Sequence, residues 1–289
     1  MSNVKEQRVA RFYFGGVAGA IGACFTHPLD LLKVQLQTQQ TKISLPQLVG
    51  VVYKSNGVLG FYNGLSASVL RQMTYSLARF AVYEGAKNQQ NGPLLFYQKI
   101  LLAAGSGAFG GLVGQPADLV NVRMQNDMKL PLDQRRNYKH AIDGLFRIPR
   151  EEGFRVLFNG VSMTCVRAAL VTIGQLGFYD QTKQVLMEKF GFFDNVKTHL
   201  FASFIAASAA TIICQPIDVI KTRLMNSAPG EFKGVMDCFA YTAKTGPTAF
   251  FKGLVPAFVR LGPHTILMLV FFEQLRINFG YLPQKKRTE

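Results

Sequence analysis

The 289-residue sequence predicts an all-α membrane protein in which six transmembrane helices form three homologous two-helix repeats, each with a short helix in its connecting loop. Three observations predict this fold class. A proline motif occurs three times, two further motifs follow each copy in the same order, and a long uncharged stretch precedes each proline. A fixed order of motifs at a regular period is the sequence pattern of a repeat protein.

The proline motif reads HPLDLLK (27–33), QPADLVN (115–121) and QPIDVIK (215–221), with its prolines at Pro28, Pro116 and Pro216. A proline inside a helix removes a backbone donor and kinks the helix. The second motif reads NGVLGFYNG (56–64), EGFRVLFNG (152–160) and TGPTAFFKG (245–253). The third reads YEGAK (83–87), YDQTK (179–183) and FEQLR (272–276). The chain therefore divides into three repeats, residues 1–94, 95–192 and 193–289.

The uncharged stretches before the prolines predict membrane-spanning helices. Residues 100–117 and 200–217 contain 18 uncharged positions each, and residues 12–26 contain 15. These lengths approach the ~20 residues that a helix needs to cross a bilayer core of ~30 Å. Small residues stand at the same three offsets before each proline and would let membrane helices pack closely. They are Gly15, Gly19, Gly22, Ala103, Gly107, Gly110, Ser203, Ala207 and Ala210.

Each repeat is expected to contain a long helix kinked at its proline, a loop with a short helix, and a second long helix. The short helices are expected near 45–55, 140–150 and 234–243, and the second helices over about 66–88, 162–186 and 255–279. Six spans place both termini on the same side of the membrane. The links between repeats are short, whereas the loops inside repeats are longer and more basic.

The net charge of +15 does not indicate a nucleic-acid binder, because the basic residues are spread through apolar repeats and accompany no nucleic-acid-binding motif. The most basic segment, residues 129–155, suits a loop on the inner face of an energised membrane. The four cysteines form no CxxC pair, and no P-loop, dinucleotide fold or catalytic triad is evident. We therefore expect no enzyme, no metal and no cofactor, and no cleavable N-terminal signal.

The first two motifs, in three copies, resemble the mitochondrial carrier family over the whole chain. The resemblance implies a six-helix bundle with pseudo-threefold symmetry about the membrane normal, in the inner mitochondrial membrane, with both termini toward the intermembrane space. It implies transport by alternating access and a functional monomer. Membrane lipid, cardiolipin in particular, is expected at the repeat motifs on the matrix side.

The acid and base after each proline lie three residues apart and therefore share one helix face. The resemblance implies that they form a ring of interhelical ion pairs, which we call the motif ring, and that this ring closes the matrix end. It comprises Asp30, Lys33, Asp118, Asn121, Asp218 and Lys221. Asp118 is expected to pair with Lys221, and Asp218 with Lys33. Asp30 would face Asn121, which departs from the family pattern.

Two glutamines, Gln37 and Gln125, match positions that brace the motif ring in the family, while the third position is Met225. The resemblance further implies a gate at the cytoplasmic end, built from the acids and bases of the third motif. These residues are Glu84, Lys87, Asp180, Lys183, Glu273 and Arg276. The sequence does not fix which neighbour each of them pairs with.

The second helices contain arginines that would lie at membrane depth, namely Arg71, Arg79, Arg167 and Arg260. Arginine is rare there and normally faces a partner or a water-filled cavity. The windows 65–83, 161–179 and 254–272 contain no Asp or Glu. We therefore predict that the partner arrives from outside, as an anion whose oxygens suit the guanidinium fork. The alternative is that these arginines snorkel or bond backbone carbonyls.

Three of these arginines are symmetric, because Arg71, Arg167 and Arg260 each stand 13 residues before the acid of the third motif. Arg79 and Gln175 occupy equivalent positions in the first two repeats, where the third repeat has Met268. This break in the symmetry predicts where the selectivity for the substrate lies.

Within the family, the stretches THPLDLLKVQLQTQQ (26–40), PADLVNVRMQND (116–127) and QPIDVIKTRLMNS (215–227) resemble a branch that transports small dicarboxylates. This implies exchange of malate, succinate or malonate for phosphate, sulfate or thiosulfate. Composition and spacing alone indicate only a small anion. An uncoupling-type or oxoglutarate-type carrier of the same family stays open, as does a channel or scaffold without obligatory exchange.

Overall fold

The computed structural model describes residues 11, 13–39, 43–88, 96–130, 134–190, 196–228 and 230–281. In each repeat a long first helix leads to a short loop helix, a 3-10 turn and a long second helix. The first helices are α1 (Phe14–Gln37), α4 (Phe96–Asp127) and α7 (Val196–Asn226). The loop segments are α2 (Leu45–Asn56), α5 (Ala141–Glu151) and α8 (Val235–Lys244), followed by η1 (Val58–Tyr62), η3 (Phe154–Phe158) and η4 (Pro247–Phe251). The second helices are α3 (Leu65–Asn88), α6 (Val161–Phe190) and α9 (Leu254–Phe279).

The motif prolines lie inside the first helices: Pro28 in α1, Pro116 in α4 and Pro216 in α7. Each helix continues for about three turns beyond its proline. The acids and bases of the proline motif therefore belong to the same long helices as the uncharged stretches before them.

Four helical segments in the described part of the chain could cross a membrane, judged by length and composition. They are Ile100–Asp127, Phe154–Glu188, Phe201–Asn226 and Pro247–Phe279. The other two long helices, α1 and α3, have 24 residues each, or ~36 Å at 1.5 Å per residue. They are long enough, but their small, polar and charged residues lower their hydropathy.

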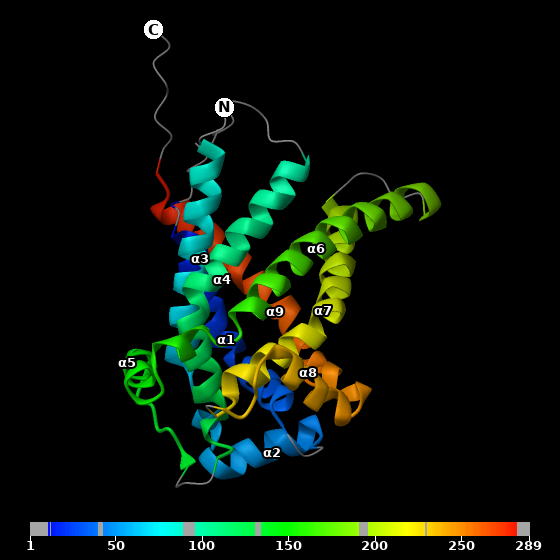
Figure 1. Cartoon of the computed structure of the whole chain (residues 1–289). Coiled ribbons are helices and arrows are strands. Elements are labelled where there is room, and N and C mark those ends of the chain that lie inside the picture. Colours follow the sequence, from blue (N-terminus) through cyan, green and yellow to red (C-terminus); the bar gives the residue numbers. More distant parts are fainter. Residues whose placement is uncertain are drawn as a thin grey trace.

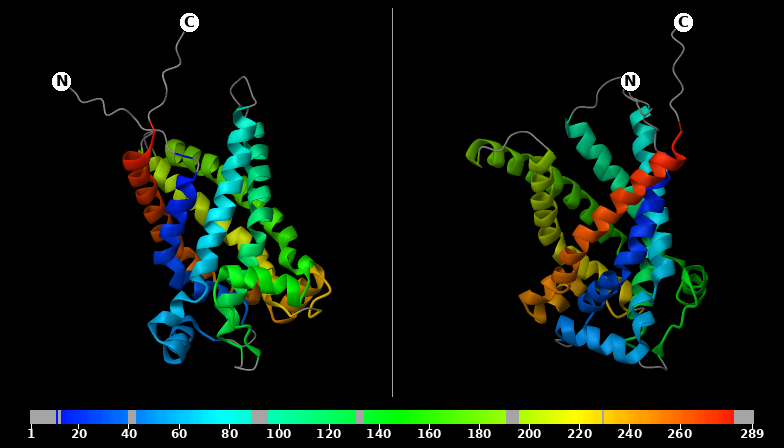
Figure 2. Two further views of the ribbon diagram at one scale, coloured as in Figure 1. Left: turned by 90° about the vertical axis from the view of Figure 1, so that its left-hand side faces the viewer. Right: turned by 180° about the vertical axis from the view of Figure 1, so that it is seen from behind.

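The long helices pack in a ring. The pairs α3 and α4, α6 and α7, and α1 and α9 join neighbouring repeats, while α1 packs on α3 and α4 on α6 within repeats. The start of α1 and the end of α9 lie at one end, which we call the terminal end (Figure 1). The short helices α2, α5 and α8 lie at the opposite, loop-helix end (Figure 1). The long helices converge at the loop-helix end and spread apart toward the terminal end (Figure 2).

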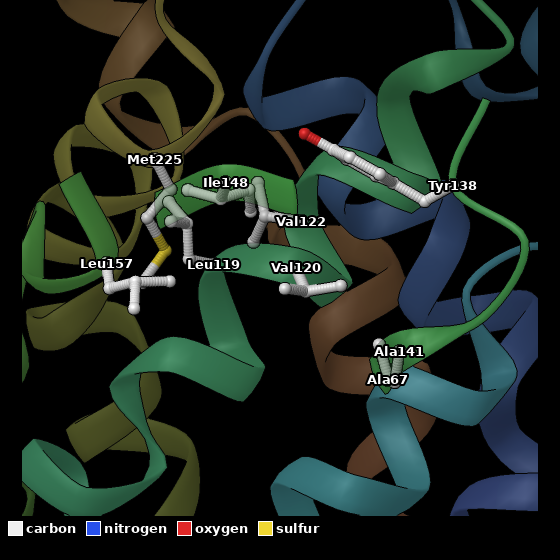
Figure 3. Close-up of a cluster of buried hydrophobic side chains, with 9 residues drawn as sticks. All are labelled: Ala67, Leu119, Val120, Val122, Tyr138, Ala141, Ile148, Leu157 and Met225. Atoms are coloured by element: carbon white, nitrogen blue, oxygen red, sulfur yellow. The ribbon is translucent and has the colours of Figure 1, made fainter. Parts of the chain in front are cut away.

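Of the two buried apolar clusters among the described residues, the larger lies at the loop-helix end and joins α4 to the loop segment of its own repeat (Figure 3). It comprises Ala67, Leu119, Val120, Val122, Tyr138, Ala141, Ile148, Leu157 and Met225. Because α3, α5, η3 and α7 all contribute side chains around α4, the cluster holds the second repeat against its two neighbours at this end. Burial of apolar area at ~25 cal/mol per Å² stabilises this arrangement.

A glycine from the small-residue pattern sets the spacing between α3 and α4. A Cβ added at Gly110 would lie 3.0 Å from the backbone oxygen of Tyr75. A larger residue at 110 would force the two backbones apart. The close approach is what small residues at membrane helix interfaces permit.

The turn before α9 yields a prediction about stability. Gly253 has φ +80° and a Cβ there would lie 2.9 Å from the backbone oxygen of Lys33. Gly230 has φ +85° with open space around it. Both alanine variants incur the left-handed strain of ~1–2 kcal/mol, but only Gly253→Ala must also displace α1. We expect thermal unfolding in detergent to shift clearly further down for Gly253→Ala than for Gly230→Ala. Equal shifts would contradict the steric argument.

A candidate anion-binding site beside the motif ring

Two ion pairs of the motif ring are present in the half of the long helices nearer the loop-helix end. Lys33 Nζ on α1 lies 2.9 Å from Asp218 Oδ2 on α7. Lys221 Nζ on α7 lies 2.6 Å from Asp118 Oδ2 on α4. All four side chains are largely buried, so desolvation offsets much of the Coulomb attraction. Such pairs hold helices together without large net stability.

The third position of the motif ring differs. Asp30 Oδ1 on α1 lies 2.6 Å from Arg260 Nη1 on α9. Asn121 Oδ1 accepts a hydrogen bond of 3.1 Å from Gln125 Nε2, one turn along α4. The charged partner of Asp30 in the structure is therefore an arginine from a second helix.

The three symmetric arginines all pair with acids of the motif ring. Arg71 Nε lies 3.6 Å from Asp118 Oδ1, and Arg167 Nε contacts Asp218 Oδ1. Arg260 in turn contacts Asp30. Each of the three arginines on a second helix therefore contacts the acid on the first helix of the following repeat, the first repeat following the third around the ring. The prediction that these arginines have no internal acidic partner is therefore wrong. It considered only the second helices, whereas the acids come from the helices packed against them.

The guanidinium groups still have hydrogen-bonding capacity for a ligand. The Nε–H groups of Arg71 and Arg260 make no hydrogen bond in the described structure, but they are buried, so a ligand would bind the exposed parts of these side chains. The side chains are 26%, 43% and 20% exposed for Arg71, Arg167 and Arg260. Since a guanidinium carries five N–H donors, an anion can reach this set without first displacing every contact.

Arg79 and Gln175 are exposed side chains on α3 and α6. They lie eight residues beyond Arg71 and Arg167, or about 12 Å nearer the terminal end. A Cβ added at Gly110 would lie 3.1 Å from Arg79 Cβ, which places Arg79 where α3 packs on α4. Their part in selectivity stays a prediction.

The brace glutamines contact the motif ring and the neighbouring helix. Gln37 Oε1 accepts a hydrogen bond of 2.9 Å from Thr222 Oγ1 on α7, and Gln125 donates to Asn121. Both keep a buried amide atom without a partner in the described structure, Nε2 of Gln37 and Oε1 of Gln125. The Gln37 contact joins α1 to α7, whereas the Gln125 contact stays within α4.

A further set of braces was missed by the sequence analysis. The side chain seven residues after each proline donates to a backbone carbonyl on the neighbouring first helix. The bonds are Gln35 Nε2 to Gln125 O (2.9 Å), Arg123 Nε to Met225 O (3.2 Å) and Arg223 Nε to Gln37 O (3.2 Å). The recurrence of a long donor side chain at one offset was visible, but its carbonyl acceptors leave no mark in a sequence.

The residue before each proline forms a second unpredicted set. His27, Gln115 and Gln215 bond the carbonyl oxygens of Asn63, Asn159 and Lys252, which precede the last glycine of the second motif. These bonds hold the turn that starts each second helix against the kinked first helix. They therefore help to position the arginines of the second helices relative to the motif ring.

The gate expected at the terminal end is only partly described. The side chains of Glu84, Lys87 and Asp180 lie outside the described structure, and Lys183 is half-buried on α6. Arg276 Nη2 lies 2.7 Å from Glu273 Oε1, within α9 itself. This pair does not join two helices, and the interhelical gate stays a prediction.

With this geometry in place, comparison with known proteins identifies the class. The family model described as mitochondrial carrier protein matches residues 5–94, 92–190 and 194–281. The chain belongs to the mitochondrial carrier family, whose members are transporters. The all-α membrane fold built from three repeats is thereby confirmed, and membership makes the chain a multi-pass protein of the inner mitochondrial membrane.

Three relatives illustrate the similarity. The chain is 63% identical to a mitochondrial dicarboxylate carrier of Caenorhabditis elegans, over 99% of this chain and 100% of that protein. It is 42% identical to a mitochondrial dicarboxylate transporter of Saccharomyces cerevisiae, over 96% and 95%. It is 38% identical to mitochondrial uncoupling protein 4 of Arabidopsis thaliana, over 93% and 97%.

Proposed function

We propose that this chain exchanges dicarboxylates such as malate, succinate or malonate for phosphate, sulfate or thiosulfate across the inner mitochondrial membrane. The observation that carries the proposal is the set of half-buried arginines from α3, α6 and α9, gathered on the motif ring. Full-length similarity to proteins named as dicarboxylate carriers supports the substrate class.

We propose that the structure corresponds to the state in which the matrix side is closed. We assign the loop-helix end to the matrix, in keeping with its basic loops, and the terminal end to the intermembrane space. Two complete ion pairs of the motif ring close the former end, while the long helices spread apart at the latter (Figure 2). An anion entering from the terminal end would meet the arginines where they contact the acids of the motif ring.

Binding is coupled to opening through the acids that the arginines share with the motif ring. When an oxyanion binds Arg71 or Arg167, that arginine no longer compensates the negative charge of Asp118 or Asp218. The partly buried carboxylate then has only its lysine as a positively charged partner. The closed ring is less stable as a result. Because a ligand shifts an equilibrium only through its differential affinity for the two states, this competition provides a physical route to alternating access.

We further propose that the protein functions as a monomer and that a cardiolipin phosphate binds at the glycine turns of the second motif. Gly64, Gly160 and Gly253 have φ of +82°, +83° and +80° and precede the second helices. The free N–H groups and dipole at a helix N-terminus favour a phosphate.

The test is counter-exchange in liposomes containing the purified protein. Uptake of labelled phosphate into liposomes loaded with malate should far exceed uptake into unloaded liposomes. Uptake of labelled malate into liposomes loaded with phosphate should show the same difference. Equal uptake into unloaded liposomes would indicate a channel. Proton leak without anion exchange would indicate the uncoupling-type alternative, and a requirement for oxoglutarate the oxoglutarate-type alternative.

A further inference from the structure

The three acids of the motif ring do not have equal positive charge around them. Asp118 and Asp218 each contact one lysine and one arginine, namely Lys221 with Arg71, and Lys33 with Arg167. Asp30 contacts Arg260 as its one lysine or arginine partner among the described side chains. The three acids are symmetric in sequence, so this difference arises from their partners.

The missing cation traces to residue 121. The lysines at the same motif position, Lys33 and Lys221, each reach an acid on a neighbouring first helix. The symmetric partner of Asp30 would come from Asn121 on α4, which is neutral and bonds Gln125. Asp30 is 6% exposed, so a carboxylate there without a cation would be strongly destabilising.

Two histidines lie near Asp30, but both have other partners. His27 Nε2 bonds the carbonyl oxygen of Asn63 at 2.9 Å. His264 Nδ1 lies 3.3 Å from Thr26 Oγ1. The permanent positive charge beside Asp30 therefore comes from Arg260, whose Nη1 lies 2.6 Å from Asp30 Oδ1.

We infer that Arg260 is the third cation of the motif ring, replacing the lysine that is absent at position 121, and that Arg71 and Arg167 bind the two oxyanionic groups of the substrate. This rests on the proposed function. When Arg71 or Arg167 turns to a ligand, Asp118 keeps Lys221 and Asp218 keeps Lys33. If Arg260 turned away, Asp30 would keep no lysine or arginine among the described side chains.

The exposure of the side chains agrees with this division. Arg167 is 43% exposed and Arg71 26%, whereas Arg260 is 20% exposed. Arg71 also has the loosest contact with its acid, at 3.6 Å. Arg71 and Arg167 both lie close enough to Asp118 to interact electrostatically with its carboxylate, so the two arginines can bind one ligand together. A dicarboxylate, phosphate or sulfate can bridge both guanidinium groups, whereas a monocarboxylate offers one group and is expected to bind more weakly.

The experiment supplies the missing lysine. Arg260→Gln is expected to lower the thermal unfolding temperature of the substrate-free protein in detergent and to reduce malate/phosphate exchange in liposomes at least tenfold. Adding Asn121→Lys should recover at least half of each loss, because the introduced ammonium group would compensate Asp30. The matched controls, Arg71→Gln/Asn121→Lys and Arg167→Gln/Asn121→Lys, should exchange no faster than the corresponding single arginine variants.

Other outcomes overturn the inference in distinct ways. A double variant that regains stability but not exchange would make Arg260 a substrate ligand, and one that regains neither would show that residue 121 does not face Asp30.

If Arg260→Gln does not fold, Arg260→Lys replaces it. One ammonium suffices for Asp30, so Arg260→Lys should retain most exchange, whereas Arg167→Lys should lose at least tenfold. Similar losses in both lysine variants would overturn the division of roles. A parent protein without malate/phosphate exchange would refute the proposed function, while the unfolding temperatures would still test the motif ring.

Discussion

Replacing Arg167 with glutamine is expected to reduce malate/phosphate exchange at least tenfold while leaving the protein folded. Arg167 is the most exposed of the three symmetric arginines, and a hydrogen bond from a charged donor contributes ~1.5–3 kcal/mol. Since ~1.4 kcal/mol corresponds to a factor of ten, its loss suffices for this effect. Asp218 retains Lys33 at 2.9 Å, so the substitution does not leave a buried carboxylate without a cation.

The measurement is initial phosphate uptake into malate-loaded liposomes, normalised to folded protein. Arg155→Gln is the control, because Arg155 is an exposed arginine of η3. It changes the net charge by the same amount away from the three symmetric arginines. Exchange near the parental rate in Arg167→Gln would remove Arg167 from the binding site. Equal losses in both variants would point to a general effect of charge on anion uptake.

The fold could be predicted because its signals are local. The glycine motif marks the start of each second helix, and the expected starts at 66, 162 and 255 fall one residue from Leu65, Val161 and Leu254. Two of the three expected ends, 88 and 279, match Asn88 and Phe279. The second helix of repeat 2 was expected to stop at 186 but continues to Phe190, because Gly191 is the first residue there that disfavours continuation.

The site could be predicted only where both partners occur in one repeated motif. Lys33 with Asp218, and Lys221 with Asp118, follow from a single motif position repeated around a ring. The contacts between arginines and these acids join the proline motif to residues outside all three motifs, on helices of different repeats. The depth of the arginines relative to the acids depends on helix tilt. The spacing of 13 residues between each arginine and the acid of the third motif does not determine that tilt. A sequence window along one helix could not reveal an acid supplied by the next.

The interior of the second repeat contains a charge pair that the other repeats lack. Arg123 is 1% exposed, and its Nη1 and Nη2 lie 2.5 and 2.8 Å from the carboxylate oxygens of Glu152. At the equivalent positions, the first repeat has Gln35 with Asn56, which are both neutral, and the third has Arg223 with Thr245. A neutral brace needs no compensating charge, whereas a buried guanidinium needs an acid or other favourable contacts. Arg223, which is 8% exposed, donates to Thr242 Oγ1 and lies 5.9 Å from the centre of the Tyr241 ring. Glu152 therefore compensates the charge that accompanies the Arg123 brace.

Glu152→Gln is expected to destabilise the protein by about 3 kcal/mol, because removing one partner of a buried pair leaves the other charge uncompensated. Glutamine retains one acceptor, which keeps the effect at the lower end of that range. The adjacent Glu151→Gln is the matched control, since Glu151 is 51% exposed and pairs with Arg147 across one turn. Such exposed pairs contribute about 0.3–0.5 kcal/mol. Thermal unfolding in detergent should therefore separate the two variants clearly.

The double variant Arg123→Gln/Glu152→Asn reproduces the neutral pair of the first repeat and should recover most of the loss, because the effects of substitutions at residues in contact are not additive. A double variant less stable than Glu152→Gln would show that Arg123 contributes by filling space between α4 and α7 rather than through its charge.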